Sequence, residues 1–137
     1  MPRILVVDDD PMVCMAIEMC LKQNNFAATT ADGAEAGLRA LDAGIFDVMI
    51  VDIFMPHMRG FESIRVFHER APPVPLIAVS GYAFADRDAP APDFLRMAIE
   101  LGASRCLRKP FTPGALLAAI NGCLSDVSSR TSELRPG

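Results

Sequence analysis

The stretch from Val48 to Gly60 constrains the fold of this chain more than any other. Its first four residues are apolar and rich in β-branched side chains, which is typical of a strand buried on both faces. The run stops at one carboxylate, Asp52, and Pro56 and Gly60 then oppose immediate regular structure. In α/β proteins the chemistry lies at the ends of such strands, so Asp52 is the first candidate for a functional residue.

Four further short apolar runs alternate with segments of helical periodicity. Together with residues 48–51, the predicted strands are residues 3–7, 26–30, 76–79 and 104–107. The predicted helices cover residues 11–23, 32–43, 61–70 and 93–101. A last helix begins at Thr112-Pro113, and its spacing places four apolar residues on one face, namely Leu116, Leu117, Ile120 and Leu124. This alternation predicts a single α/β domain with a parallel sheet.

Length and composition agree with one folded domain. The chain has 137 residues, of which 51% are hydrophobic and 22% charged, which excludes a disordered chain. Its apolar runs are far shorter than the roughly 20 residues of a membrane span. Asp8 ends the first run too early for a signal peptide, so we expect a cytoplasmic protein without membrane insertion. The net charge of −4, with no basic run, argues against direct binding of nucleic acid.

The four cysteines do not have metal-ligand spacing. Cys14, Cys20, Cys106 and Cys123 are scattered, and no C-x-x-C motif or neighbouring histidine pair accompanies them. We interpret Cys14 and Cys20, which fall in a helical pattern, as buried thiols.

Polar residues follow four of the five apolar runs. The carboxyl ends of parallel strands share one edge of the sheet, so these residues are expected to converge. The candidates are Asp8 and Asp9 after the first strand, Asp52 after the third, Ser80 after the fourth and Lys109 after the fifth. Taken singly, each is also an ordinary turn, helix-cap or surface residue. Their joint placement favours a functional site.

Three clustered carboxylates repel one another unless a cation or shared protons compensate. Oxygen ligands with open positions suit Mg²⁺, which keeps several waters and binds phosphate oxygens. A hydroxyl and an ammonium nearby are the donors that a phosphoryl group needs. The chemistry that fits is phosphoryl transfer to an aspartate.

With these residues in view, the chain resembles the receiver domains, or response regulators, of bacterial two-component signalling. The resemblance spans residues 2–124 and rests on four motifs, which are Ile4–Asp9, Val51–Pro56, Ser80-Gly81 and Lys109-Pro110-Phe111. It implies a flavodoxin-like, doubly wound (βα)5 fold with sheet order 2-1-3-4-5. It also implies a stand-alone phosphoacceptor that is not an enzyme in the usual sense.

The resemblance assigns a role to each matched residue. Asp52 would be the phosphoacceptor, and Ser80 the switch hydroxyl. Lys109 would pair with the phosphoryl group, and a cis bond is expected between it and Pro110. The implied Mg²⁺ ligands are Asp8, Asp9, Asp52 and the backbone carbonyl of Phe54.

Two departures from the family pattern stand out. Cys106 occupies the position of the usual aromatic switch residue on the last strand, which leaves the route of the outward signal open. The stretch Tyr82–Pro92 is longer than expected, and we expect it to shape partner choice. A further hypothesis is that Phe54 and Tyr82 shield the site from water and prolong the life of the phosphoryl group.

The implied partners are a sensor histidine kinase or a histidine phosphotransfer protein, and a downstream protein target. Phosphorylation would act through the face formed by the fourth helix, the fifth strand and the last helix. We expect the receiver to cover residues 1–124 and residues 125–137 to be a flexible tail without an output domain.

Two other functions fit part of the sequence. A phosphatase of the haloacid dehalogenase type would use Asp8 and Asp10, but residues 110–125 lack the acidic pair that this family requires. It would also leave the motif around Asp52 unexplained. The second alternative is a receiver-shaped interaction module that is never phosphorylated.

Overall fold

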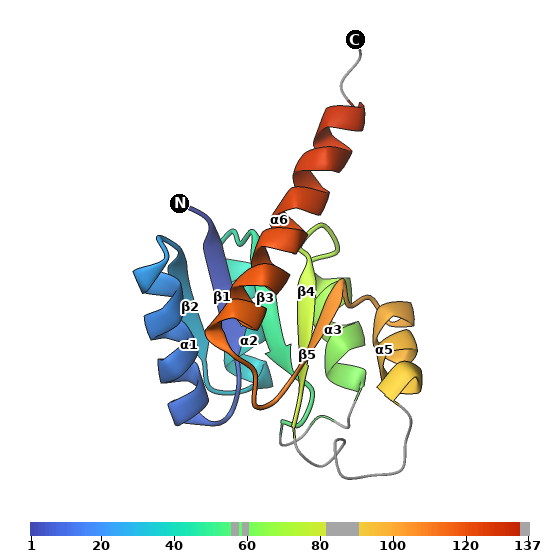
Figure 1. The fold of residues 1–137 in the computed structure, drawn as a ribbon. Helices are drawn as coiled ribbons and strands as arrows, with labels where there is room; N and C mark the ends of the chain where they lie inside the picture. The colour runs from blue at the N-terminus through green and yellow to red at the C-terminus, as the bar shows by residue number, and fades with distance from the viewer. Residues whose placement is uncertain (56–57, 59–60, 82–90, 135–137) are drawn as a thin grey trace.

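The structure is a computed structural model that describes residues 1–55, 58, 61–81 and 91–134. Its strands are β1 (Arg3–Val7), β2 (Ala27–Ala31), β3 (Val48–Asp52), β4 (Leu76–Ser80) and β5 (Arg105–Arg108). Its helices are α1 (Pro11–Gln23), α2 (Ala34–Ala43), α3 (Glu62–Arg70), α5 (Ala91–Glu100) and α6 (Pro113–Leu134). Figure 1 shows the strands in the centre and helices on both sides.

The five strands form one parallel sheet in the order β2-β1-β3-β4-β5. This is the flavodoxin-like order that the family resemblance implied, and it is confirmed. All five residues of β3 and all five of β4 are buried. Strands covered on both faces have no polar side, which explains why their sequences read as continuous apolar runs.

Alternate strand residues supply two separate cores. Ile4 and Val6 face α1 and α6, whereas Leu5 and Val7 face α2, α3 and α5. The first core includes Ile17, Leu21, Ile50, Ile77, Leu116 and Ile120; the second includes Met49, Val51, Ile64, Phe67, Leu76 and Ala98. Helices α1 and α6 therefore cover one face of the sheet, and α2, α3 and α5 cover the other (Figure 1).

The predicted element boundaries needed small corrections. Strands β2 and β5 each lie one residue later than predicted, and α2 begins at Ala34 and not at Asp32. Helix α5 begins at Ala91, two residues before the predicted start, because proline is tolerated in a first helical turn and Pro92 lies there. Residues 82–90 of the unusually long stretch lie outside the described residues.

The last helix is the largest difference from prediction. It continues to Leu134, ten residues beyond Leu124, so residues 125–134 are helical in the structure where the sequence suggested a flexible tail. These residues include no proline or glycine, the two residue types that most strongly oppose a helix interior. Arg105 also lies against α6, with its Nη2 atom 3.2 Å from Asp126 Oδ2. In Figure 1 the end of α6 projects beyond the sheet.

Among the described residues, no helix combines the length and the apolar character that a membrane crossing needs.

Candidate functional site

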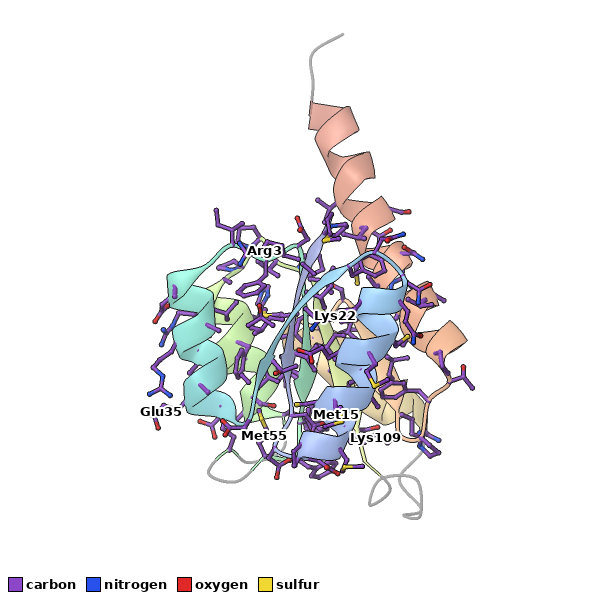
Figure 2. The ribbon with its side chains drawn as sticks, turned by 90° about the vertical axis from the view of Figure 1, so that its left-hand side faces the viewer. Arg3, Met15, Lys22, Glu35, Met55 and Lys109 are labelled. Atoms are coloured by element: carbon purple, nitrogen blue, oxygen red, sulfur yellow. The ribbon has the colours of Figure 1, made fainter. Side chains whose placement is uncertain are left out.

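The pairing of the strands brings the predicted site residues to one edge of the sheet. Val7 pairs with Val51, so Asp8 and Asp52 follow neighbouring positions of β1 and β3. The backbone N–H of Lys109 donates to the carbonyl of Ser80 over 2.8 Å, which joins the ends of β4 and β5. Figure 2 shows Lys109 at the end of the molecule opposite Arg3, which begins β1.

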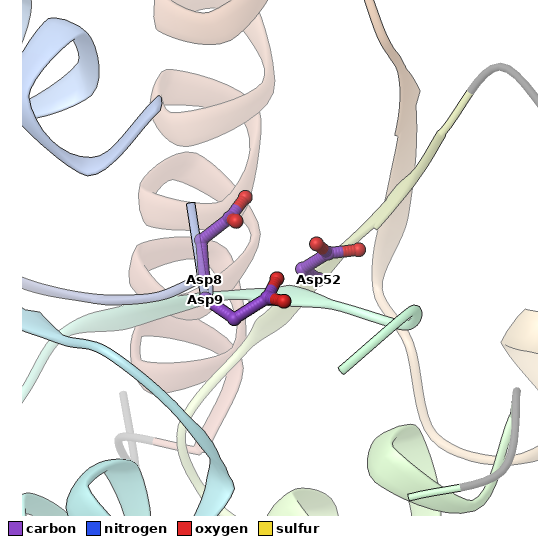
Figure 3. Close-up of side chains that lie close together, drawn as sticks. All are labelled: Asp8, Asp9 and Asp52. Carbon is purple, nitrogen blue, oxygen red and sulfur yellow. The ribbon is translucent and has the colours of Figure 1, made fainter. Parts of the chain in front are cut away.

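Three carboxylates gather at this edge. One oxygen each from Asp8, Asp9 and Asp52 lies within 4.8 Å of the other two. Asp8 and Asp52 are 3% and 4% exposed, whereas Asp9 is exposed to solvent. Figure 3 shows the three side chains around a common space. This arrangement combines two buried anions with one that solvent can reach.

Lys109 supplies a positive charge to this cluster. Its Nζ atom lies 2.8 Å from Asp8 Oδ2 and 3.3 Å from Asp52 Oδ2. The peptide bond between Lys109 and Pro110 is cis, as the resemblance implied. One ammonium therefore bridges both buried carboxylates.

The protonation of these groups follows from their surroundings. Burial raises the pKa of Asp52, and the nearby charge of Asp8 raises it further; the Phe54 N–H and Lys109 oppose this shift without cancelling it. Burial alone would lower the pKa of Lys109. The hydrogen bond to Asp8 and the charges of Asp52 and Asp8 outweigh burial and raise that pKa. Lys109 therefore stays protonated at neutral pH.

Ser80 and Phe54 complete the edge. Ser80 is 1% exposed, and its Oγ atom has no hydrogen-bond partner among the residues that the structure describes. Phe54 follows Asp52, and its backbone N–H donates to Asp52 Oδ1 over 2.9 Å. A Cβ atom added at Gly81 would lie 3.8 Å from the Phe54 ring, so this ring lies beside the end of β4. Tyr82 lies outside the described residues.

These residues fit Mg²⁺ and a phosphoryl group. Among the described residues, three carboxylates face one ammonium, and a divalent cation would offset the excess of negative charge that these groups carry. Within the described part of the chain the buried Ser80 hydroxyl lacks a partner, and buried polar groups in proteins normally have one. Asp8, Asp9 and Asp52 would hold the metal, and Ser80 Oγ is available as a donor to an oxygen of a bound group.

Sequence reasoning missed the contribution of Cys14. Its Sγ atom lies 3.2 Å from the backbone carbonyl of Asp8, to which the thiol donates. Burial, and then the charge of Asp8, raise the pKa of Cys14, so the thiol keeps the proton that it donates. The position of Cys14 on the buried face of the helix that follows Asp8 was the available signal.

Cys106 lies on β5, half-buried, and packs against the second core. Burial raises its pKa to about 11, so it is a neutral thiol. It lines a surface hollow of about 390 Å³ together with Ile99, Ser104, Arg105, Ala118 and Ala119. A hollow therefore lies beside Cys106 on the surface formed by α5, β5 and α6.

A stability measurement can test the charge balance at Asp52. Its raised pKa means that the folded state binds this proton more tightly than the unfolded state, so stability falls as pH rises from the ordinary value of 3.8 through the raised one. At neutral pH, without Mg²⁺, Asp52→Asn is expected to raise the melting temperature, because Lys109 keeps its contact with Asp8. The difference should vanish in acid, where Asp52 is protonated in both states. A lower melting temperature at neutral pH would show that the Lys109 pair outweighs burial.

Comparison with known proteins adds to this geometry. The family model of the response regulator receiver domain matches residues 4–121. The cell cycle response regulator CtrA of Brucella ovis is 29% identical over 119 residues, which cover 87% of this chain and 48% of that protein. This chain thus spans about half the length of the curated relatives that it matches.

Solved structures show the same architecture. A CheY-like receiver domain protein from Methanospirillum hungatei superposes with a TM-score of 0.82 at 26% identity, over 95% of this chain and 98% of that one. FixJ from B. japonicum gives a TM-score of 0.80 at 26% identity, over 96% of this chain and 61% of that one. The likeness to both extends over nearly the whole chain.

Proposed function

Because this chain belongs to the response regulator receiver domain family of two-component signalling, we propose that it accepts a phosphoryl group on Asp52. The donor is the phosphohistidine of a sensor histidine kinase or of a histidine phosphotransfer protein. The reaction requires Mg²⁺ held by Asp8, Asp9, Asp52 and the backbone carbonyl of Phe54. The modified domain then changes its binding to a downstream protein in the cytoplasm.

Each group has a defined task in this proposal. A carboxylate oxygen of Asp52 attacks phosphorus, the bond from phosphorus to the donor nitrogen breaks, and an acyl phosphate forms. Mg²⁺ when bound offsets the negative charge of the carboxylates and of the transferred group. Lys109 pairs with a phosphoryl oxygen, and Ser80 donates its hydroxyl proton to another.

The observation that carries the proposal is the unpartnered Ser80 hydroxyl beside a buried carboxylate cluster bridged by Lys109. A purely structural cluster has no use for a buried hydroxyl without a partner. A phosphoryl group on Asp52 would supply acceptor oxygens for both the hydroxyl and the ammonium.

The direct test is incubation with acetyl phosphate or phosphoramidate and Mg²⁺, followed by intact-mass measurement. The expected result is the addition of one phosphoryl group, which is labile to hydroxylamine and absent when EDTA is present. Absence of any modification would support an unphosphorylated interaction module.

The geometry at Asp10 argues against the phosphatase alternative. In that function Asp10 would act beside Asp8. Its side chain instead caps helix α1 by accepting a hydrogen bond of 2.9 Å from the Met12 N–H, and it is exposed. Continuous release of phosphate from phosphoesters in the same incubation would revive this alternative.

Phe54 is expected to affect how long the phosphoryl group persists. Phe54 is 39% exposed, and its ring lies beside the end of β4, next to Gly81. A bulky ring there restricts the approach of a hydrolytic water. Phe54→Ser should therefore speed dephosphorylation, by about tenfold if the ring contributes roughly 1.4 kcal/mol to the barrier. Loss of the phosphoryl group is followed by intact mass after removal of the donor, and an unchanged rate would refute the shielding role.

The output surface in this proposal is the face of α5, β5 and α6. Phosphorylation shifts an existing equilibrium of this face, and a partner binds one of its states. The hollow at Cys106 and the exposed side chains of Met97 and Ile99 are features that a partner can contact. A pull-down that compares phosphorylated and unphosphorylated protein tests this step.

A further inference from the structure

Helix α1 carries apolar side chains on both of its faces. Its buried face is formed by three residues, namely Cys14, Ile17 and Leu21. On the opposite side Met12 is 71% exposed, and Met15 and Met19 are each 56% exposed. Their spacing of three and four residues places these side chains along a single face of the helix. The helix thus presents an apolar stripe to solvent, and we call Met12, Met15 and Met19 the methionine stripe.

Such a stripe is unusual on the outer face of a surface helix, which normally carries charged and polar residues. From Pro11 to Leu21 the only charged residue of α1 is Glu18. Among the described residues, nine large hydrophobic side chains are exposed, and the methionine stripe supplies three of them. Exposed apolar side chains that lie together mark interaction surfaces, and the flexible methionine side chain adapts to a partner. The stripe is therefore a candidate interface.

The surface beside the stripe has room for the side chains of a partner. A hollow of about 520 Å³ opens between α1, β2 and α2, and Pro11, Met15 and Ala36 are among the residues that line it. Figure 2 looks onto this side of the molecule and labels Met15 and Lys22 on α1. A second helix that lies along α1 would contact the methionine stripe and could place a side chain in this hollow.

The exposed face of α1 is complementary to itself when one copy is turned end to end. In an antiparallel pair whose two-fold axis passes beside Met15, Met12 of one copy faces Met19 of the other. The same register brings Asp9 of one copy level with Lys22 of the other. Asp9 is exposed, and the side chain of Lys22 is 63% exposed. A symmetric dimer needs a patch of this kind, because the same residues must match one another after a rotation of 180°.

We propose that two copies of this chain associate through α1, with their methionine stripes packed as an antiparallel pair. The centre of the contact is apolar, and opposite charges face each other at both of its ends. This reversal of charge along α1, from Asp9 to Lys22, favours a second copy over an unrelated apolar partner. The inference goes beyond the proposed function, because the contact needs neither Mg²⁺ nor a phosphoryl group.

The first test is the mass of the unaltered chain in solution, measured by sedimentation equilibrium over a range of concentrations in a buffer without Mg²⁺. One helix from each copy makes a small contact, and interfaces below about 1,200 Å² are typically weak. The average mass is therefore expected to rise with concentration from 14.8 kDa toward twice that value. A mass that stays at 14.8 kDa up to about 1 mM would overturn the proposal and assign the stripe to a different protein.

A variant tests whether the stripe forms the contact. Met15→Glu would place two carboxylates close to the two-fold axis of the pair, and like charges that face each other oppose association. The dissociation constant of the dimer is expected to rise by at least about tenfold. Because Met15 is exposed, the variant is expected to fold, which circular dichroism checks.

The matched control is Ile45→Glu, which makes the same kind of change at a side chain that is 80% exposed and lies outside α1. This variant should associate like the unaltered chain. Equal weakening by both variants, or no weakening by Met15→Glu, would contradict a contact through the methionine stripe.

Cross-linking tests the antiparallel register. A carbodiimide condenses an amine with a carboxylate, with loss of water and without a spacer. Within one copy, Asp9 and Lys22 lie near opposite ends of the 13-residue α1, which is about 20 Å long, so they cannot be joined. In a mixture of ¹⁴N- and ¹⁵N-labelled chains, a linked product of Lys22 with Asp9 or Asp10 is expected to carry both labels. Dimers that form without this mixed-label product would contradict the antiparallel pair.

Discussion

Asp52→Asn is expected to abolish the acyl phosphate completely. The variant keeps the size of the side chain and its 2.9 Å hydrogen bond from the Phe54 N–H, but the amide is not a nucleophile that can form an acyl phosphate. Intact mass after incubation with acetyl phosphate and Mg²⁺ should show no added phosphoryl group. The expected effect is total because no other described carboxylate lies within hydrogen-bond reach of Lys109 except Asp8.

Asp10→Asn is the matched control for this experiment. Asp10 carries the same functional group two residues from Asp8, but its side chain caps α1, and asparagine caps a helix about as well as aspartate. This variant should be labelled like the unaltered protein. Full labelling of Asp52→Asn would identify another acceptor and would contradict the assignment.

Phe67→Ala is expected to cause the largest loss of stability among single substitutions in the core. Phe67 is fully buried between α3 and the sheet. Helix α2 approaches so closely that a Cβ atom added at Gly37 would lie 2.9 Å from the ring. Truncation of a buried phenylalanine leaves a cavity and typically costs about 3–5 kcal/mol, a large share of the roughly 5–15 kcal/mol that stabilises a domain.

The measurement is urea unfolding followed by circular dichroism, because the chain has no tryptophan for fluorescence. Ile45→Ala is the control: its side chain is 80% exposed, and the variant should stay within about 0.5 kcal/mol of the unaltered protein. An equal decrease in the free energy of unfolding in the two variants would show that burial does not determine how much stability Phe67→Ala loses.

The sequence was most informative about features that a short stretch of residues determines by itself. Short apolar runs such as residues 76–79 are typical of strands buried on both faces, and their alternation with amphipathic segments predicted the layers. The site residues were found because parallel strands end at one edge of the sheet. The roles of Asp52, Ser80 and Lys109 came from the family resemblance and remain predictions.

The sequence was least informative about features that depend on contacts between residues far apart along the chain. Residues 125–134 are mostly polar and carry no signal that separates a helix from a tail, and the contact between Arg105 and Asp126 joins residues far apart in the chain. The bridge from Lys109 to both Asp8 and Asp52 was equally invisible. Strand ends predict that these groups share an edge, but not which atoms meet.

The groups of the candidate site are also far apart along the chain. Asp8 and Lys109, whose side chains meet at 2.8 Å, are separated by 101 positions, since 109 − 8 = 101. No fragment that lacks β1 or β5 can assemble this contact, however well the rest of it folds. The yield of acyl phosphate from a small phosphodonor would therefore measure the fraction of molecules that are completely folded. The decrease of this yield with denaturant concentration would follow the cooperative unfolding of the domain.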